Sequence, residues 1–434
     1  MKKIALVFTV IAFCLISNMV QVFIDSPEMR DHTSAGVDII FQQEASPTLI
    51  GGFSSARLDN YTSCLILKTA GYVGPETFFQ KAFGGLRVDL PITEDVDGWG
   101  AFCTYATGYE SPTGGLSYSR YWHGYILPLR LLLTATTFTN IQMLFYGLVL
   151  LLTLALFLSL YKNHLSSLIL PFALALFIMM PSALGICIQY VPVTIICLLS
   201  CLILSGCYER VRTFPGNAVF FGITGLLTCY YDLLTFPMIT LCMPLVILIQ
   251  QMIIRKESRL LTRVLCCIIG WCIGYFGIWV LKFILNIFLY GSYDAMNVIR
   301  QIKLRVSTRS NGASFSRLDA LYSNIFVLLG KDLYKFLLFA FTVYEIIHVF
   351  QSIRRNTFQI KPVAFLFLIP GLIPILWMLF TSNHIYDHFY YTYRNLGGTI
   401  FAIVAFLETL SFPAQSLSAE SIQPGQAITF GNNE

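Results

Sequence analysis

Charged residues are scarce in this chain of 434 residues. Only 12% of the residues are Asp, Glu, Lys or Arg, whereas roughly a quarter are charged in a typical soluble protein. Apolar residues make up 56% of the chain and lie in long blocks. The formal net charge of +5 comes from short segments between these blocks and not from one basic surface. This composition excludes a water-soluble enzyme of ordinary type and a nucleic-acid reader, and it indicates a membrane protein.

The sequence also lacks the common motifs of metal and nucleotide sites. Its 12 cysteines show no metal-finger spacing, and most lie in or beside apolar blocks, where thiols behave as small hydrophobic groups. Neither a Walker loop nor a Rossmann glycine pattern is present. Only Cys64 and Cys103 lie in a polar segment, where a disulfide could form outside the cytosol. No cofactor is expected, and a divalent metal ion is compatible with the sequence but not indicated by it.

Ten apolar blocks are predicted to span the membrane. The first, residues 4–24, follows two lysines and does not end in small residues, so we expect an uncleaved anchor with a cytosolic N-terminus. Basic residues then recur in the loops predicted to be cytosolic, as the positive-inside rule requires. The other nine spans are predicted at 141–161, 166–184, 188–207, 217–231, 236–254, 263–287, 334–351, 362–381 and 396–411.

The predicted fold is an all-α polytopic membrane domain over residues 1–411. Its first extracytoplasmic loop, residues 25–125, is large, and its Gly and Pro punctuation favours short helices over a separate β domain. Residues 412–434 are rich in Ser, Gln and Pro and are predicted to be a disordered cytosolic tail. We expect a multi-pass protein of the plasma (inner) membrane, with both termini in the cytosol and the active site outside.

An acidic residue near the start of the large loop is the first catalytic candidate. Residues 56–70 have apolar side chains at the spacing of an amphipathic helix, which we expect to lie on the membrane surface. Asp59 is near the N-terminal end of this helix. It could be a first-turn acid favoured by the helix dipole, or a functional carboxylate beside the bilayer.

Further along the same loop, a compact set of side chains favours binding of a sugar and a phosphate. Arg120 offers an anion fork, Tyr121 and Trp122 offer aromatic faces, and His123 offers a titratable donor. Arg pairs well with phosphate, and Trp can stack on a sugar ring. The alternative is that these residues are ordinary anchors at the membrane interface.

A second acid, Asp232, is predicted at the outer end of a span, in a tight turn that ends at Pro237. An ionisable group at membrane depth is costly, so it is a functional-site hypothesis by default. The neighbouring Tyr and Thr residues could instead simply satisfy its hydrogen bonds.

Two more segments predicted to lie outside are rich in polar candidates. The stretch 383–395 contains His384, Asp387, His388, Tyr390 and Arg394, and its two histidines have a helical i,i+4 spacing. Without the following Glu of the zinc-protease signature, this spacing favours substrate binding over a metal. The loop 288–332 is unusually basic for an outer loop, which suggests an anionic partner. Its basic residues are Arg300, Lys303, Arg305, Arg309 and Arg317.

Taken together, these features resemble the GT-C class of integral-membrane glycosyltransferases, which take sugars from polyprenyl-phosphate donors. Leu58-Asp59-Asn60-Tyr61 looks like the acid entry of their first outer loop, although Asn60 stands where a second acid is usual. Tyr121-Trp122-His123-Gly124 falls where that loop returns to the membrane. The likeness covers about residues 1–411.

The resemblance implies an inverting transfer of a sugar to a glycan or lipid acceptor at the extracytoplasmic face. Asp59 would be the general base, and Arg120, His123 and Arg394 or the basic loop 300–317 would hold the donor phosphate. A transporter or flippase of a lipid-linked saccharide is the alternative, but transporters usually have polar residues or helix breaks near mid-bilayer. A polysaccharide polymerase or ligase also remains open, since it shares the substrate class.

Overall fold

The computed structural model describes residues 2–88, 98–103, 115–310, 312–354 and 361–411. Within these ranges the chain is almost entirely α-helical. The only two strands described there, β1 (Arg309–Ser310) and β2 (Ala313–Ser314), form an antiparallel hairpin. Five helices are long and apolar enough to cross a membrane. The prediction of an all-α membrane protein is therefore confirmed, whereas the predicted tail 412–434 lies outside the described residues.

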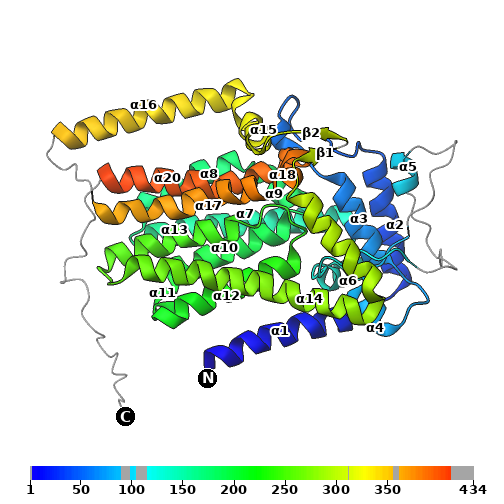
Figure 1. The fold of residues 1–434 in the computed structure, drawn as a ribbon. Helices are drawn as coiled ribbons and strands as arrows, with labels where there is room; N and C mark the ends of the chain where they lie inside the picture. Colours follow the sequence, from blue (N-terminus) through cyan, green and yellow to red (C-terminus); the bar gives the residue numbers. More distant parts are fainter. Residues whose placement is uncertain (1, 89–97, 104–114, 311, 355–360, 412–434) are drawn as a thin grey trace, which may run out of the picture.

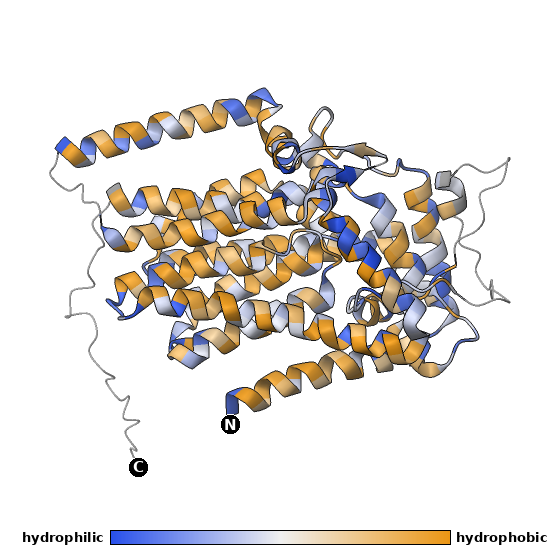
Figure 2. Ribbon diagram, viewed as in Figure 1, coloured by the Kyte–Doolittle hydropathy of each residue, from blue (hydrophilic) through white to orange (hydrophobic). Residues whose placement is uncertain are grey.

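The body of the molecule is a bundle of helices that run side by side (Figure 1). Figure 2 shows that these helices are predominantly hydrophobic along their length and that polar residues gather at the two ends of the bundle. The bundle comprises α1 (Lys2–Val20), α7 (Phe138–Lys162), α8 (Ile169–Ile178), α9 (Pro181–Ile186), α10 (Val191–Gly206), α12 (Phe214–Tyr231), α13 (Ile239–Ile254), α14 (Leu260–Arg305), α16 (Asp332–Arg354), α17 (Leu368–Phe380) and α20 (Leu396–Ser411).

Five of the ten predicted spans correspond to the helices of spanning length, at Lys2–Phe23, Phe138–Lys162, Leu260–Arg305, Asp332–Arg354 and Pro362–Phe380. Other predicted spans form shorter helices: α10, α13 and α20 have 16 residues each. At 1.5 Å per residue such a helix is about 24 Å long, less than a hydrocarbon core of about 30 Å. The count of ten spans stays a prediction.

The span predicted at 166–184 is not one continuous helix. It is divided into η3 (Ser166–Leu168), α8 and α9, with Met180 between the two α-helices in the left-handed region at φ 59°. Pro181 is the first residue of α9, and a proline disfavours the α conformation in the residue before it. The apolar pattern alone did not reveal this break.

Helix α13 is the centre of the bundle. All its residues from Ile239 to Met252 are buried, as expected of a helix that is apolar on every side. Helices α12 and α14 approach one another through glycines. A Cβ on Gly274 would lie 1.9 Å from the carbonyl oxygen of Gly222, so a larger residue would force the two helices apart.

One end of the bundle, here called the capped end, is covered by short helices that cross the bundle direction (Figure 1). The segments predicted to lie outside meet there: His384 contacts the carbonyl oxygen of Leu234 at 2.6 Å, and Arg394 donates to that of Ser55 at 3.0 Å. The helices and 3-10 turns of this end are η1 (Gln21–Phe23), α2 (Pro27–Phe41), η2 (Ser54–Ala56), α3 (Asn60–Gly71), α4 (Phe78–Phe83), α5 (Gly98–Cys103), α6 (Ile126–Ala135), α15 (Arg317–Leu329), α18 (Ser382–Asp387), α19 (Phe389–Thr392) and η5 (Tyr393–Asn395).

The other end of the bundle holds basic residues of the predicted cytosolic loops. Arg212 and Arg263 pair with Glu257, and Arg255 pairs with Glu209, around the short helix α11 (Tyr208–Val211). The turn η4 (Pro362–Phe367) precedes α17 at this end. All the segments predicted to be outside and described here therefore lie away from these basic loops.

The 46-residue helix α14 changes direction at Gly291. Gly291 has φ 77° and ψ −171°, a backbone conformation that only glycine adopts readily. The residues before Gly291 run along the bundle, and the residues after it run across the capped end toward β1 (Figure 1). The predicted basic loop 288–332 is thus largely helical, with Arg300 and Arg305 on the second part of α14.

Candidate functional site

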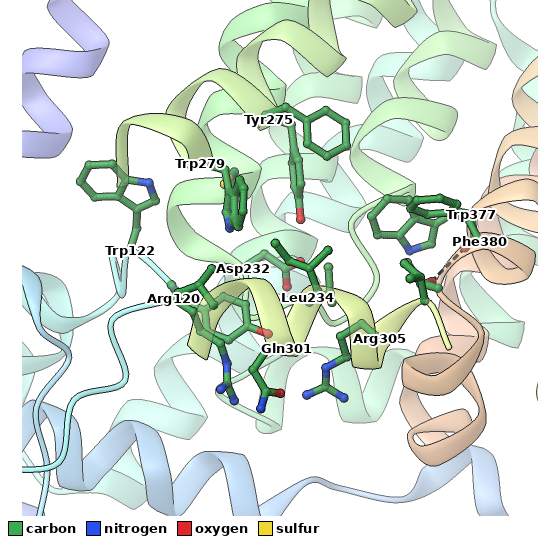
Figure 3. A pocket seen from close by; sticks show the side chains of 17 residues that line it. Arg120, Trp122, Asp232, Leu234, Tyr275, Trp279, Gln301, Arg305, Trp377 and Phe380 are labelled. Carbon is green, nitrogen blue, oxygen red and sulfur yellow. Dashed lines mark hydrogen bonds between the residues drawn. The ribbon is translucent and has the colours of Figure 1, made fainter. Parts of the chain in front are cut away.

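A pocket of about 190 Å³ lies at the capped end (Figure 3). Both parts of α14, the turn after α12, the loop before α6 and the end of α17 form its walls. Five of the residues predicted from the sequence line it: Arg120, Tyr121, Trp122, Asp232 and Arg305. The full lining is Arg120, Tyr121, Trp122, Cys229, Asp232, Leu234, Tyr275, Phe276, Trp279, Val298, Gln301, Ile302, Arg305, Val306, Trp377, Phe380 and Thr381.

Asp232 is the acid of this pocket. It follows the last residue of α12, and its Oδ1 accepts hydrogen bonds from the backbone N–H of Thr235 at 2.9 Å and from the Thr235 hydroxyl. The residue is only 3% exposed. Burial raises the pKa of Asp232 from 3.8 to about 6, against the opposing effect of the Thr235 hydrogen bonds. Such a carboxyl can take up and release a proton near neutral pH.

Arg120 and Arg305 bring two positive charges to the same pocket. In Figure 3 their guanidinium groups and the amide of Gln301 lie along one edge of the pocket, beyond Asp232. Arg120 lies over the Tyr118 ring at 4.4 Å and the Tyr121 ring at 5.6 Å. Its Nε is buried without a hydrogen-bond partner in the described part of the chain. An unused N–H donor on this half-buried arginine is suited to an anion.

Aromatic residues that the sequence analysis missed form the opposite wall. Tyr275 and Trp279 are one helical turn apart on α14, and Trp377 comes from the end of α17. Trp279 and Trp377 are half-buried, so part of each indole remains accessible. The i,i+4 spacing of Tyr275 and Trp279 places both rings on one face of a helix. This spacing does not stand out in the sequence, because the apolar block around it is rich in aromatic residues. Gln301 was missed because its position depends on the bend at Gly291.

Trp122 is buried and cannot offer a free stacking face. Its indole Nε1 donates to the carbonyl oxygen of Ile278 at 2.9 Å, and its ring meets Phe83 edge-on at 6.3 Å. The ammonium group of Lys282 lies 5.4 Å from the ring centroid and donates to the Phe83 carbonyl oxygen. Trp122 thus joins the loop to α14, and Lys282 is satisfied within the same cluster.

His123 does not line the pocket. It is 2% exposed, and its ring nitrogens contact the Tyr125 hydroxyl at 2.7 Å and the Tyr118 carbonyl oxygen at 2.8 Å. Burial lowers the pKa of His123 to about 3, so the ring is neutral at physiological pH. Its expected role as a charged phosphate ligand does not agree with this environment.

Asp59 is also placed outside this pocket. It is the N-cap of α3: Oδ1 accepts from the Thr62 N–H at 2.9 Å, and Oδ2 accepts from the Thr62 hydroxyl at 2.7 Å. Asp59 is 2% exposed, and burial raises its pKa to about 6. Helix α3 is buried from Ser63 to Gly71 beneath α2 and α6, so it is not an amphipathic helix on the membrane surface. Asp59 is not among the residues that line the pocket around Asp232, so this pocket is not a common cleft for the two acids.

The segment 383–395 borders the pocket through its histidines. His388 accepts a hydrogen bond from Arg305 at 3.3 Å, and burial, together with the nearby Arg305, lowers the pKa of His388 to about 3. His384 is 4.8 Å from His388 between ring centroids, and its Nδ1 has no partner among the described residues. Of these two rings, His388 contacts Arg305 directly, and His384 packs against His388. Neither histidine lines the pocket itself.

The remaining candidates do not form part of this site. Arg394 is fully buried and donates to the carbonyl oxygens of Met179, Tyr390 and Ser55, so it is a structural residue. Tyr390 lies under the guanidinium group of Arg57 at 5.3 Å. The exposed Asp387 accepts hydrogen bonds from Ser310 and Asn383, and Arg300 is exposed on α14.

The described residues contain no group of three or more His, Cys, Asp or Glu side chains arranged to hold a metal ion. Cys64 and Cys103 are both buried. Comparisons of the chain with protein-family models, curated proteins and solved structures gave no match. The site must therefore be interpreted from its own geometry.

Proposed function

We propose that this protein is a membrane glycosyltransferase that moves a sugar from a polyprenyl-phosphate donor to a glycan or lipid acceptor. The main support is the pocket that combines the buried Asp232 carboxyl with Arg120 and Arg305 at the capped end. A carboxyl with a raised pKa is suited to general-base catalysis, and two guanidinium groups are suited to a phosphate.

Asp232 takes the role of general base in this proposal, in place of Asp59. The acceptor hydroxyl gives its proton to the Asp232 carboxylate while its oxygen forms a bond to the anomeric carbon of the sugar. The bond between that carbon and the phosphate oxygen breaks, and the phosphate keeps the electron pair. Arg120 and Arg305 stabilise the negative charge that develops on the departing polyprenyl phosphate.

The apolar side of the pocket suits the lipid part of the donor. Phe276, Ile302 and Phe380 line the pocket and remain exposed on the surface of the bundle, where the bilayer surrounds them. Trp279 and Trp377 provide aromatic surface for a sugar ring. A polyprenyl chain can therefore stay in the bilayer while its phosphate reaches the arginines.

The proposed topology has ten spans in the plasma (inner) membrane. The capped end faces the extracytoplasmic side, and the end with the Arg212, Arg255 and Arg263 ion pairs faces the cytosol. This orientation follows the positive-inside rule. Among the shorter helices, α13 is surrounded by its neighbours and so is spared contact with lipid.

The experiment that separates this activity from lipid flipping uses the purified protein in vesicles that contain a radiolabelled polyprenyl-phosphate sugar. Lipids and glycans extracted from cell membranes serve as acceptors. A transferase moves the label from the polyprenyl lipid into another product and leaves polyprenyl phosphate. Movement of intact labelled lipid between leaflets without loss of its sugar would instead support the flippase. If neither transfer nor movement is seen, both functions are rejected.

A further inference from the structure

A second cavity, of about 390 Å³, lies between α16 and the rest of the bundle. Its walls come from α8, α15, α16, α17 and α20, with Phe177, Leu328, Leu337 and Ile400 among the lining residues. It shares no lining residue with the pocket around Asp232. It is therefore a separate cavity.

The interior of this cavity is hydrophobic. Only two of its 17 lining residues have polar groups, Tyr334 and Thr399, and both groups are already bonded. The Tyr334 hydroxyl is 2.9 Å from that of Ser55, and the Thr399 hydroxyl donates to the carbonyl oxygen of Gly371 at 2.9 Å. Water would find no free partner here, whereas a hydrocarbon would lose nothing by entering. An apolar cavity of about 150 Å³ already binds benzene, so this one can hold a longer hydrocarbon.

Helix α16 packs loosely beside this cavity. Only 11% of its most apolar 18-residue window is buried within the protein, and its buried residues are Tyr334, Glu345 and Ser352. Figure 1 shows α16 along the side of the bundle, apart from α17 and α20. The lining residues of α20, from 396 to 404, extend about 12 Å along the helix axis. Since empty space destabilises a protein in proportion to its volume, we expect this space to be filled.

A positive charge lies at the capped end of the cavity. Lys331 directly precedes α16, three residues before the lining residue Tyr334, and its ammonium group lies 5.8 Å from the centroid of the Phe53 ring. In the described part of the chain Lys331 has no acidic partner, whereas its neighbour Lys335 pairs with Asp332 at 3.1 Å. An apolar space with a cation at the level of the membrane interface matches an amphiphile with an anionic head group.

We propose that this cavity binds an anionic glycerophospholipid of the surrounding bilayer. One acyl chain fills the space between α16 and α20, and the head-group phosphate pairs with Lys331. The bound lipid supplies the packing that α16 lacks and fixes this helix against the bundle. This site is independent of the glycosyltransferase proposal, because it uses neither Asp232 nor the two pocket arginines.

Lipid titrations followed by native mass spectrometry test the site with the full-length protein in detergent. The probes are phosphatidylglycerol and phosphatidylcholine with the same acyl chains. We expect tighter binding of phosphatidylglycerol to the wild-type protein. Leu337→Trp fills the cavity and should weaken this binding at least tenfold, whereas Phe336→Trp, on the exposed side of α16, should leave it unchanged.

Two charge variants test the head-group contact without altering the cavity. Lys331→Gln should remove the preference for phosphatidylglycerol, and the matched change Lys335→Gln should preserve it. Asp232→Asn should not affect lipid binding here, even if it abolishes sugar transfer. Equal binding of both lipids by the wild-type protein, or unchanged binding in both Leu337→Trp and Lys331→Gln, would overturn the proposal.

Discussion

Asp59 and Asp232 have the same local hydrogen bonding, but of the two only Asp232 lines the pocket at the capped end. Each carboxylate accepts hydrogen bonds from the backbone N–H and the hydroxyl of the threonine three residues later, Thr62 or Thr235. Burial raises the pKa of each to about 6. The position of the carboxylate, and not its local chemistry, distinguishes a catalytic candidate from a helix cap.

The pH dependence of sugar transfer should follow the ionisation of Asp232. Because burial raises its pKa to about 6, the carboxylate base predominates above pH 6 and is progressively lost below it. We expect the transfer rate to fall about tenfold per pH unit in the acid range, as for a single essential base. Initial rates between pH 4.5 and 8 measure this, with donor binding recorded at each pH. A rate that is flat between pH 5 and 7 would contradict the role of Asp232.

Arg120 and Arg305 should each contribute to binding of the lipid phosphate. A hydrogen bond to a charged group contributes about 1.5–3 kcal/mol, so Arg120→Gln and Arg305→Gln should each weaken binding of polyprenyl phosphate about 10- to 100-fold. Arg300→Gln is the matched control, because Arg300 lies on the same part of α14 but is exposed and outside the pocket. Equal affinities for all three variants, measured by scintillation proximity, would exclude these arginines as phosphate ligands.

Arg394 should affect stability and not phosphate binding. Arg394→Met removes a buried guanidinium group that donates to three backbone carbonyl oxygens, which then lose these partners. We expect a loss of about 3–5 kcal/mol, the range for breaking a buried charged interaction. Thermal unfolding in detergent measures the change. An unchanged unfolding temperature combined with lost donor binding would contradict this and support a donor-binding role for Arg394.

The topology can be tested with single cysteines in a protein without native thiols. Asp387, at the capped end, and Lys256, at the opposite end, are suitable positions, since Asp387 is exposed and Lys256 lies in a loop between α13 and α14. In right-side-out vesicles, we expect an impermeant maleimide to label Asp387→Cys but not Lys256→Cys. Labelling of position 256 alone would show that the protein has the orientation opposite to the one proposed.

Much of the helical architecture follows from the sequence, because apolar blocks and basic loops are local signals. The turn with Asp232 was predictable for the same reason. The role of Arg394 was not, since it bonds to carbonyl groups 215 and 339 positions away in the chain. The approach of Gln301 and Arg305 to the pocket depends on the bend at Gly291, which the sequence shows only as one more glycine.

The most direct measurement of the central claim is sugar transfer by Asp232→Asn and Asp59→Asn, compared side by side at pH 7.5. Both changes keep the size of the side chain, and Asn is as good an N-cap as Asp, so Asp59→Asn controls for loss of a buried carboxyl. We expect Asp232→Asn to lower transfer from a polyprenyl-phosphate sugar by about 10² to 10⁴, the range for a general base, with donor binding preserved. Asp59→Asn should retain most of the wild-type rate. Full activity of a correctly inserted Asp232→Asn protein, with loss of activity in Asp59→Asn, would contradict the assignment.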